Sequence, residues 1–140
     1  MIENLYISKD DYQMIVDYSL KGKPLEVCGI IAGTKEEDSY KTAKVYLMKN
    51  TAASAEEYLM EPEEQFEVFK DIRENDTELI AIFHSHPHSP ARPSLKDIDM
   101  AHYPDAVYVI VSLENLAAID FKGFIIKDNA YREVKITIEK

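Results

Sequence analysis

Two histidines and an aspartate stand at a spacing suited to binding a metal ion. His84 and His86 lie two positions apart, where the apolar run ELIAIF gives way to HSHP, and Asp97 follows on the next segment. Side chains at i and i+2 of a strand project to the same side, so both imidazoles can reach one ion. Two histidines, one carboxylate and an open fourth position are the donor set of a catalytic zinc site. Structural zinc sites are usually closed and thiolate-rich, and this chain has one cysteine, Cys28.

A hydrolytic site of this kind also needs a group that moves protons. Zinc in an open site lowers the pKa of its water to about 7, and a nearby base must take the proton and pass it to the leaving amine. Glu26 is the candidate, because it stands in the otherwise apolar segment LEVCGIIAG, which we predict to be a buried strand. A buried carboxylate is costly unless something uses it. The alternative is a structural ion pair between Glu26 and a buried lysine or arginine.

Ser94 and Asp97 allow two interpretations. Serine followed three residues later by an acid is a helix-capping pattern, and taken alone it favours a cap over a metal site. A lone histidine at the end of a strand would also more often be a hydrogen-bonded polar residue than a ligand. His84 and His86 together with Asp97 reverse that preference and favour a metal ion. Capping by Ser94 and metal binding by Asp97 do not exclude each other.

These residues carry a family resemblance. HSHP, six residues, serine, two residues and aspartate, with a glutamate upstream in an apolar segment, closely resembles the JAMM motif of the JAB/MPN metallopeptidases, which include metal-dependent deubiquitinases. The segments EVCGIIAG, YLMEPEEQF and HYPDAVYVIVS are also similar to small standalone prokaryotic members. The resemblance implies that His84, His86 and Asp97 bind Zn²⁺. It further implies that Glu26 acts as general base and then general acid, and that Ser94 helps to hold the oxyanion.

The resemblance also implies a class of substrate. Family members hydrolyse peptide or isopeptide bonds after the C-terminal Gly-Gly of ubiquitin-like or sulfur-carrier (β-grasp) proteins, which would reach the site through their C-terminal tail. The segment 51–61 is a candidate rim that could pair with such a tail by strand addition. Alternatives are a zinc peptidase or amidase acting on small substrates and a non-catalytic MPN scaffold, although every motif position is filled. A deaminase is disfavoured because its zinc site needs several cysteines. A homodimer is left open.

The pattern of the chain predicts the elements that must position these residues. Continuous apolar strands alternate with helices, which predicts an α/β, three-layer fold with a central mixed sheet. The resemblance implies the cytidine-deaminase-like (JAB/MPN) form of that fold. A first helix should run from Ser8 to about Leu20, and a second from Pro62 to about Asn75 with a core stripe of Phe66, Phe69 and Ile72. Expected strands are LEVCGIIAG, TAKVYLMKN, ELIAIFHSH, AVYVIVSL, AAIDFKGFIIK and REVKITIEK, with a short helix from Ser94 to about His102.

Composition limits the classes of protein further. The chain has 140 residues, which predicts one domain over 1–140, and its net charge of -10 disfavours nucleic acid and anionic membranes as partners. A single cysteine rules out an intrachain disulfide. The N-terminus lacks a signal-peptide pattern, and the apolar runs are far shorter than the roughly 20 residues of a membrane span. We therefore expect a soluble cytoplasmic protein.

Overall fold

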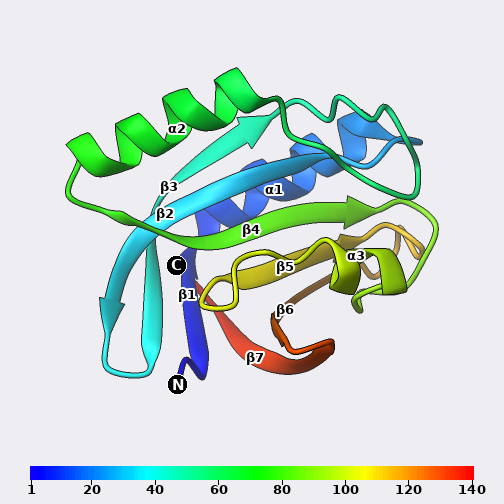
Figure 1. The fold of residues 1–140 in the computed structure, drawn as a ribbon. Coiled ribbons are helices and arrows are strands. Elements are labelled where there is room, and N and C mark those ends of the chain that lie inside the picture. The colour runs from blue at the N-terminus through cyan, green and yellow to red at the C-terminus, as the bar shows by residue number, and fades with distance from the viewer.

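The computed structural model describes residues 1–140, which form seven strands and three helices (Figure 1). In chain order these are β1 (Asn4–Ser8), α1 (Lys9–Gly22), β2 (Cys28–Glu36), β3 (Ser39–Met48), α2 (Pro62–Glu74), β4 (Glu78–His86), α3 (Leu95–Asp99), β5 (Val107–Ser112), β6 (Asp120–Lys127) and β7 (Ala130–Glu139). None of the helices is long and apolar enough to cross a membrane.

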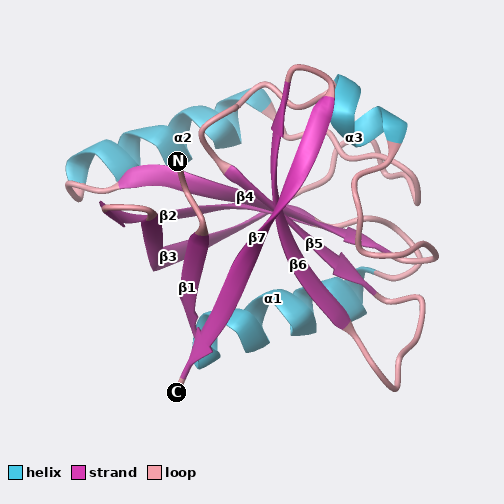
Figure 2. Cartoon of the chain, turned by 90° about the horizontal axis from the view of Figure 1, so that it is seen from below, coloured by secondary structure: helices cyan, strands magenta, loops and turns pink.

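The sheet is mixed, as predicted, but it closes on itself. Its order is β1-β3-β2-β4-β5-β6-β7, and β1 pairs in parallel with both β3 and β7. The β4–β5 pair is parallel as well, and the remaining pairs are antiparallel, including the β6–β7 hairpin. Helices α1 and α2 lie on opposite sides of the strands (Figure 2). The three-layer description is not confirmed, because β1 closes the seven strands into a barrel instead of leaving an open sheet.

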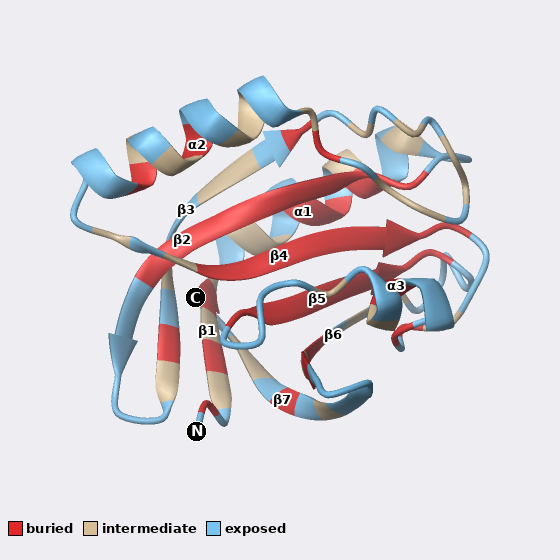
Figure 3. Ribbon diagram, viewed as in Figure 1, coloured by how far each residue is buried: buried red, intermediate tan, exposed pale blue.

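Strand β4 forms the rigid base of the candidate site. It is buried continuously from Ile80 to His86, with β2 on one side and β5 on the other (Figure 3). Within this ladder His84 lies opposite Cys28 of β2 and Ile110 of β5. Backbone hydrogen bonds on both edges fix the direction of each side chain, so the two histidines leave the strand in a defined orientation.

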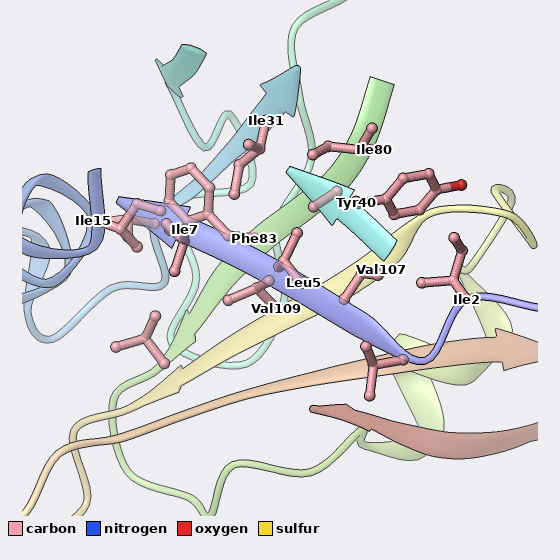
Figure 4. Packing of buried hydrophobic residues seen from close by; sticks show 14 of the residues in the cluster. Ile2, Leu5, Ile7, Ile15, Ile31, Tyr40, Ile80, Phe83, Val107 and Val109 are labelled. Carbon is pink, nitrogen blue, oxygen red and sulfur yellow. The ribbon is translucent and has the colours of Figure 1, made fainter. Parts of the chain in front are cut away.

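Buried apolar side chains pack on both sides of this base. One cluster fills the space between the strands and α1, with Leu5, Ile15 and Phe83 among its fully buried members (Figure 4). A second cluster joins the sheet to α2 through Val68 and Ile72. Each fully buried large aliphatic or aromatic side chain stabilises the fold by roughly 1.5–3 kcal/mol. The end of β4 is therefore supported from both sides.

The two long helices begin and end close to the predicted residues. Ser8 caps α1 by accepting a hydrogen bond from the Asp11 amide at 3.1 Å, and α2 starts at Pro62. The predicted core stripe of α2 is wrong in part. Phe66 is 63% exposed, whereas Val68 and Ile72 are the buried residues of the helix. The segment from Leu95 to Asp99 is helical, so α3 is shorter than predicted.

Candidate metal centre

The side chains of His84, His86 and Asp97 converge on one point. The two Nε2 atoms lie 3.1 Å apart, and Asp97 Oδ2 lies 3.2 Å from His84 Nε2 and 3.0 Å from His86 Nε2. All three residues are buried and form a group that could hold a metal ion. Ligands around tetrahedral zinc at about 2.0–2.1 Å are roughly 3.3–3.4 Å from one another. The observed triangle has nearly the size that such an ion requires.

The hydrogen bonds of His86 also favour a cation. Its Nδ1 lies 2.8 Å from the Pro90 carbonyl, which can only accept, so Nδ1 carries the proton. In a neutral ring Nε2 then presents a lone pair to Asp97 Oδ2, another acceptor. Two acceptors this close repel each other unless a proton or a metal ion lies between them. An outer partner of this kind is typical of histidines that bind metals.

Asp97 is placed by the cap of α3. The amide of Asp97 donates to Ser94 Oγ, and the amide of Ser94 donates to Asp97 Oδ2, each at 3.0 Å. The capping interpretation of this pair is therefore correct, and the same carboxylate oxygen faces both histidines. Ser94 itself is exposed, and since its oxygen accepts in the cap, its hydroxyl proton remains free to be donated.

The pKa values of the three clustered residues depend on burial and on their contacts with one another. Burial lowers the pKa of His84, which therefore stays neutral near pH 7, the form that binds metals. Burial alone would also lower the pKa of His86, but its interactions with Asp97 and Pro90 outweigh this and raise it. Burial would raise the pKa of Asp97, yet hydrogen bonds with the two histidines hold it far below its usual value. Asp97 is thus a carboxylate at any ordinary pH.

Glu26 lies beside this cluster, though not in the predicted strand. Strand β2 begins only at Cys28, and Glu26 stands two residues before it, with 4% of its surface exposed. Ser85 holds the neighbouring residue: Val27 N donates to Ser85 Oγ at 2.9 Å, and Ser85 N donates to the Val27 carbonyl at 3.0 Å. Glu26 Oε1 is buried without a hydrogen-bond partner in the protein, and no lysine or arginine pairs with it. The alternative of a structural ion pair is not supported.

Burial raises the pKa of Glu26 to about 8, an effect that the charge of His86 opposes and that of Asp97 reinforces. A carboxyl group with a pKa near neutrality can both accept and donate a proton under working conditions. Glu26 is therefore a candidate for an acid–base group.

The raised pKa of Glu26 predicts how stability varies with pH in metal-free protein. The folded state keeps the proton up to about pH 8, whereas an unfolded glutamate loses it near pH 4.5. Stability should therefore fall as pH rises through this window, by on the order of 2 kcal/mol between pH 6 and pH 8. Chemical denaturation of chelator-treated wild type and Glu26→Gln should show the larger loss in the wild type, because only the wild type carries the contribution of Glu26. His86 contributes in the same direction to both proteins, so parallel curves would contradict the assignment.

Two residues of the loop that follows β3 contact residues of the site. The segment between β3 and α2 carries Tyr58, whose ring stacks on His84 with centroids 4.8 Å apart and planes 26° apart. Asn50, where this segment begins, donates to the Glu26 carbonyl at 3.0 Å. No strand forms in the segment, which has only one isolated bridge, between Asn50 and Met60. Tyr58 lies within the predicted rim 51–61 but is not singled out by the sequence, and Asn50 lies outside that range.

Cys28 and a surface cavity do not belong to this cluster. Cys28 is fully buried in a hydrophobic cluster, and burial raises the pKa of its thiol to about 12, so it packs as a small core residue. A cavity of about 610 Å³ opens near the N-terminus and is lined by Tyr40, Tyr131 and Arg132 among others. None of the clustered residues lines it, so this cavity and the candidate chemistry are separate.

Comparison with known proteins agrees with this fold and identifies the family. Residues 8–122 match the family described as prokaryotic homologs of the JAB domain, and the chain belongs to this family of metallo-isopeptidase-type hydrolases. It is 29% identical over 134 residues to a CysO-cysteine peptidase of Mycobacterium tuberculosis, covering 96% of this chain and 90% of the relative. It is 32% identical over 117 residues to a desampylase of Pyrococcus furiosus, covering 82% and 77%. A solution structure from Desulfitobacterium hafniense superposes with a TM-score of 0.89 at 32% identity, covering 97% and 93%.

Proposed function

We propose that this chain is a zinc-dependent hydrolase that cleaves the peptide or isopeptide bond after the C-terminal Gly-Gly of a ubiquitin-like or sulfur-carrier protein. One observation carries the proposal: a buried His84, His86 and Asp97 cluster stands beside a buried carboxyl group, Glu26, whose Oε1 has no hydrogen-bond partner in the protein. The relatives' names, CysO-cysteine peptidase and desampylase, support the reaction and the class of substrate.

His84, His86 and Asp97 would hold the ion, and the fourth position would remain open. Zinc in such a site supplies Lewis acidity that makes water a nucleophile near neutral pH. Imidazole and carboxylate ligands suit zinc, although manganese or iron also binds such donor sets.

Glu26 and Ser94 would carry out the remaining chemistry. The Glu26 carboxylate takes the proton from the attacking water and delivers it to the departing amine. Its lack of a protein partner leaves Oε1 available for this transfer. The Ser94 hydroxyl donates to the oxyanion that develops on the scissile carbonyl, a contact that acts mainly in the transition state. Its exposure and its unused proton suit this role.

Mass spectrometry of a defined substrate tests this proposal. A small β-grasp protein extended beyond its C-terminal Gly-Gly is incubated with the zinc-loaded chain, with and without chelator. We expect chelator-sensitive cleavage directly after the second glycine. The matched control replaces the two glycines with valines, whose side chains should block entry. No cleavage by an enzyme confirmed to hold zinc, or cleavage that chelator does not affect, would contradict the proposal.

A further inference from the structure

We infer that Asn50 is a positioning residue whose single amide holds both the acid–base group Glu26 and the aromatic ring that orients His84. The inference deepens the proposed function and rests on it. Asn50 lies just after β3, outside the motif that supplies the ligands, and it contacts neither His84, His86 nor Asp97 by a hydrogen bond.

The amide of Asn50 uses all its hydrogen-bonding capacity within the site loop. Its Nδ2 donates to the carbonyls of Glu26 and Glu57, each at 3.0 Å. Its Oδ1 accepts from the amides of Ala52 at 3.0 Å and Leu59 at 2.9 Å. A primary amide has two donor protons and two acceptor lone pairs, so no capacity is left over. Such a fully satisfied network fixes its members in one arrangement.

Two of these hydrogen bonds are made to the backbone on either side of Tyr58. Glu57 and Leu59 are its immediate neighbours, and Asn50 binds the carbonyl of the first and the amide of the second. Both peptide units beside Tyr58 are thus held by one side chain. The tyrosine ring is thereby fixed in its stack on the His84 imidazole.

His84 depends on this stack because it lacks the usual outer partner. Histidines that bind metals generally donate their second ring nitrogen to a carbonyl or carboxylate, which fixes the ring orientation. His86 has such a partner in the Pro90 carbonyl, whereas His84 Nδ1 is buried without any. The flat face of Tyr58 is the contact that defines the plane of the His84 ring.

The same loop holds the backbone of Glu26 on both sides. Glu26 N donates to the Ser54 carbonyl at 2.8 Å, and the Glu26 carbonyl accepts from Asn50. Because Glu26 precedes β2, these bonds replace the ladder bonds that a strand residue would have. Loss of Asn50 should therefore displace the carboxyl group and loosen His84 together.

Metal affinity and steady-state kinetics of Asn50→Ala test the inference. We expect zinc to bind about 10–100-fold more weakly in competition with a chromogenic chelator. At saturating zinc, kcat should fall roughly 10²-fold while KM changes little, because misplacement of the base acts on the chemical step. The visible spectrum of the cobalt-loaded protein should also change, since it reports ligand geometry. Val68→Ala is the matched control: it removes a buried side chain from α2 without touching the Asn50 bonds, and should leave metal affinity unchanged.

If Asn50→Ala does not fold, variants of Tyr58 test the inference with Asn50 intact. Tyr58→Phe keeps the stacked ring and should bind zinc like the wild type, whereas Tyr58→Leu should bind it about tenfold more weakly. Wild-type affinity and kcat in Asn50→Ala, or equal affinity in the two Tyr58 variants, would overturn the inference alone. Failure of the wild type to bind zinc would instead overturn the proposed metal centre, and this inference with it.

Discussion

Replacement of Glu26 by glutamine should reduce turnover roughly 10²- to 10⁴-fold and leave zinc affinity within about twofold of the wild type. Glutamine has nearly the same shape as glutamate but cannot accept a proton at neutral pH. Glu26 does not belong to the three-residue cluster, so the ligands should remain in place. Cleavage is followed by mass spectrometry and bound zinc by elemental analysis on the same preparations.

Glu56→Gln is the control for this experiment. Glu56 is exposed on the neighbouring loop, and its charge acts on the pKa of Glu26 without contributing to the chemistry. We expect it to lower turnover by no more than a small factor. Loss of zinc from Glu26→Gln would show that Glu26 is a ligand or a structural residue, and undiminished turnover would remove it from the mechanism.

Replacement of Asp97 by alanine should weaken zinc binding by more than the roughly 10–100-fold that loss of an outer-shell partner produces. The substitution removes the only carboxylate of the cluster and leaves two neutral imidazoles as ligands. Turnover should fall in proportion to the metal lost. Competition titration measures the affinity, and elemental analysis measures the zinc retained after purification.

Loss of the helix cap is the effect that must be separated from loss of the ligand. Asp97→Asn keeps an oxygen that can accept from the Ser94 amide, so α3 stays capped while the negative charge is removed. Asp99→Ala removes an exposed carboxylate at the end of the same helix and should bind zinc normally. Full zinc occupancy in Asp97→Ala would refute the three-ligand assignment.

The local features of the fold could be predicted because they depend on nearby residues. Ser8 and Pro62 mark the starts of α1 and α2, and the Asp128–Asn129 turn has the positive φ angles that such residues tolerate. The closing strand β1 was missed. It has only five residues, NLYIS, and its parallel partners β3 and β7 are distant in the chain, so no local pattern indicates the pairing.

The sequence predicts where helices and strands begin and end better than it predicts which of their side chains are buried. On α2 the large ring of Phe66 suggested a core position, yet the helix is rotated so that the smaller Val68 is buried. Glu26 was expected inside a strand because its neighbours are apolar. The ladder starts later, since Val27 gives its amide to the Ser85 side chain and not to a neighbouring strand.

The residues of the candidate site also differ in whether the sequence could predict them. His84, His86 and Asp97 could be selected because strand alternation and one short loop set their spacing, and the structure brings them together. Asn50 and Tyr58 could not, since their segment reaches the site only through tertiary contacts with Glu26 and His84. Ser85 lies between the two histidines in the sequence, where strand alternation directs its side chain to the opposite side, and it accepts from the Val27 amide.

Metal reconstitution tests the central claim most directly. Chelator-stripped protein is titrated with zinc while cleavage of a Gly-Gly-extended β-grasp protein is measured, with Asp97→Ala treated in parallel. We expect no cleavage by the stripped protein, recovery that rises in proportion to added zinc until each chain holds a single ion, and no comparable recovery in Asp97→Ala. Undiminished cleavage by stripped protein, or equal recovery in the variant, would contradict it.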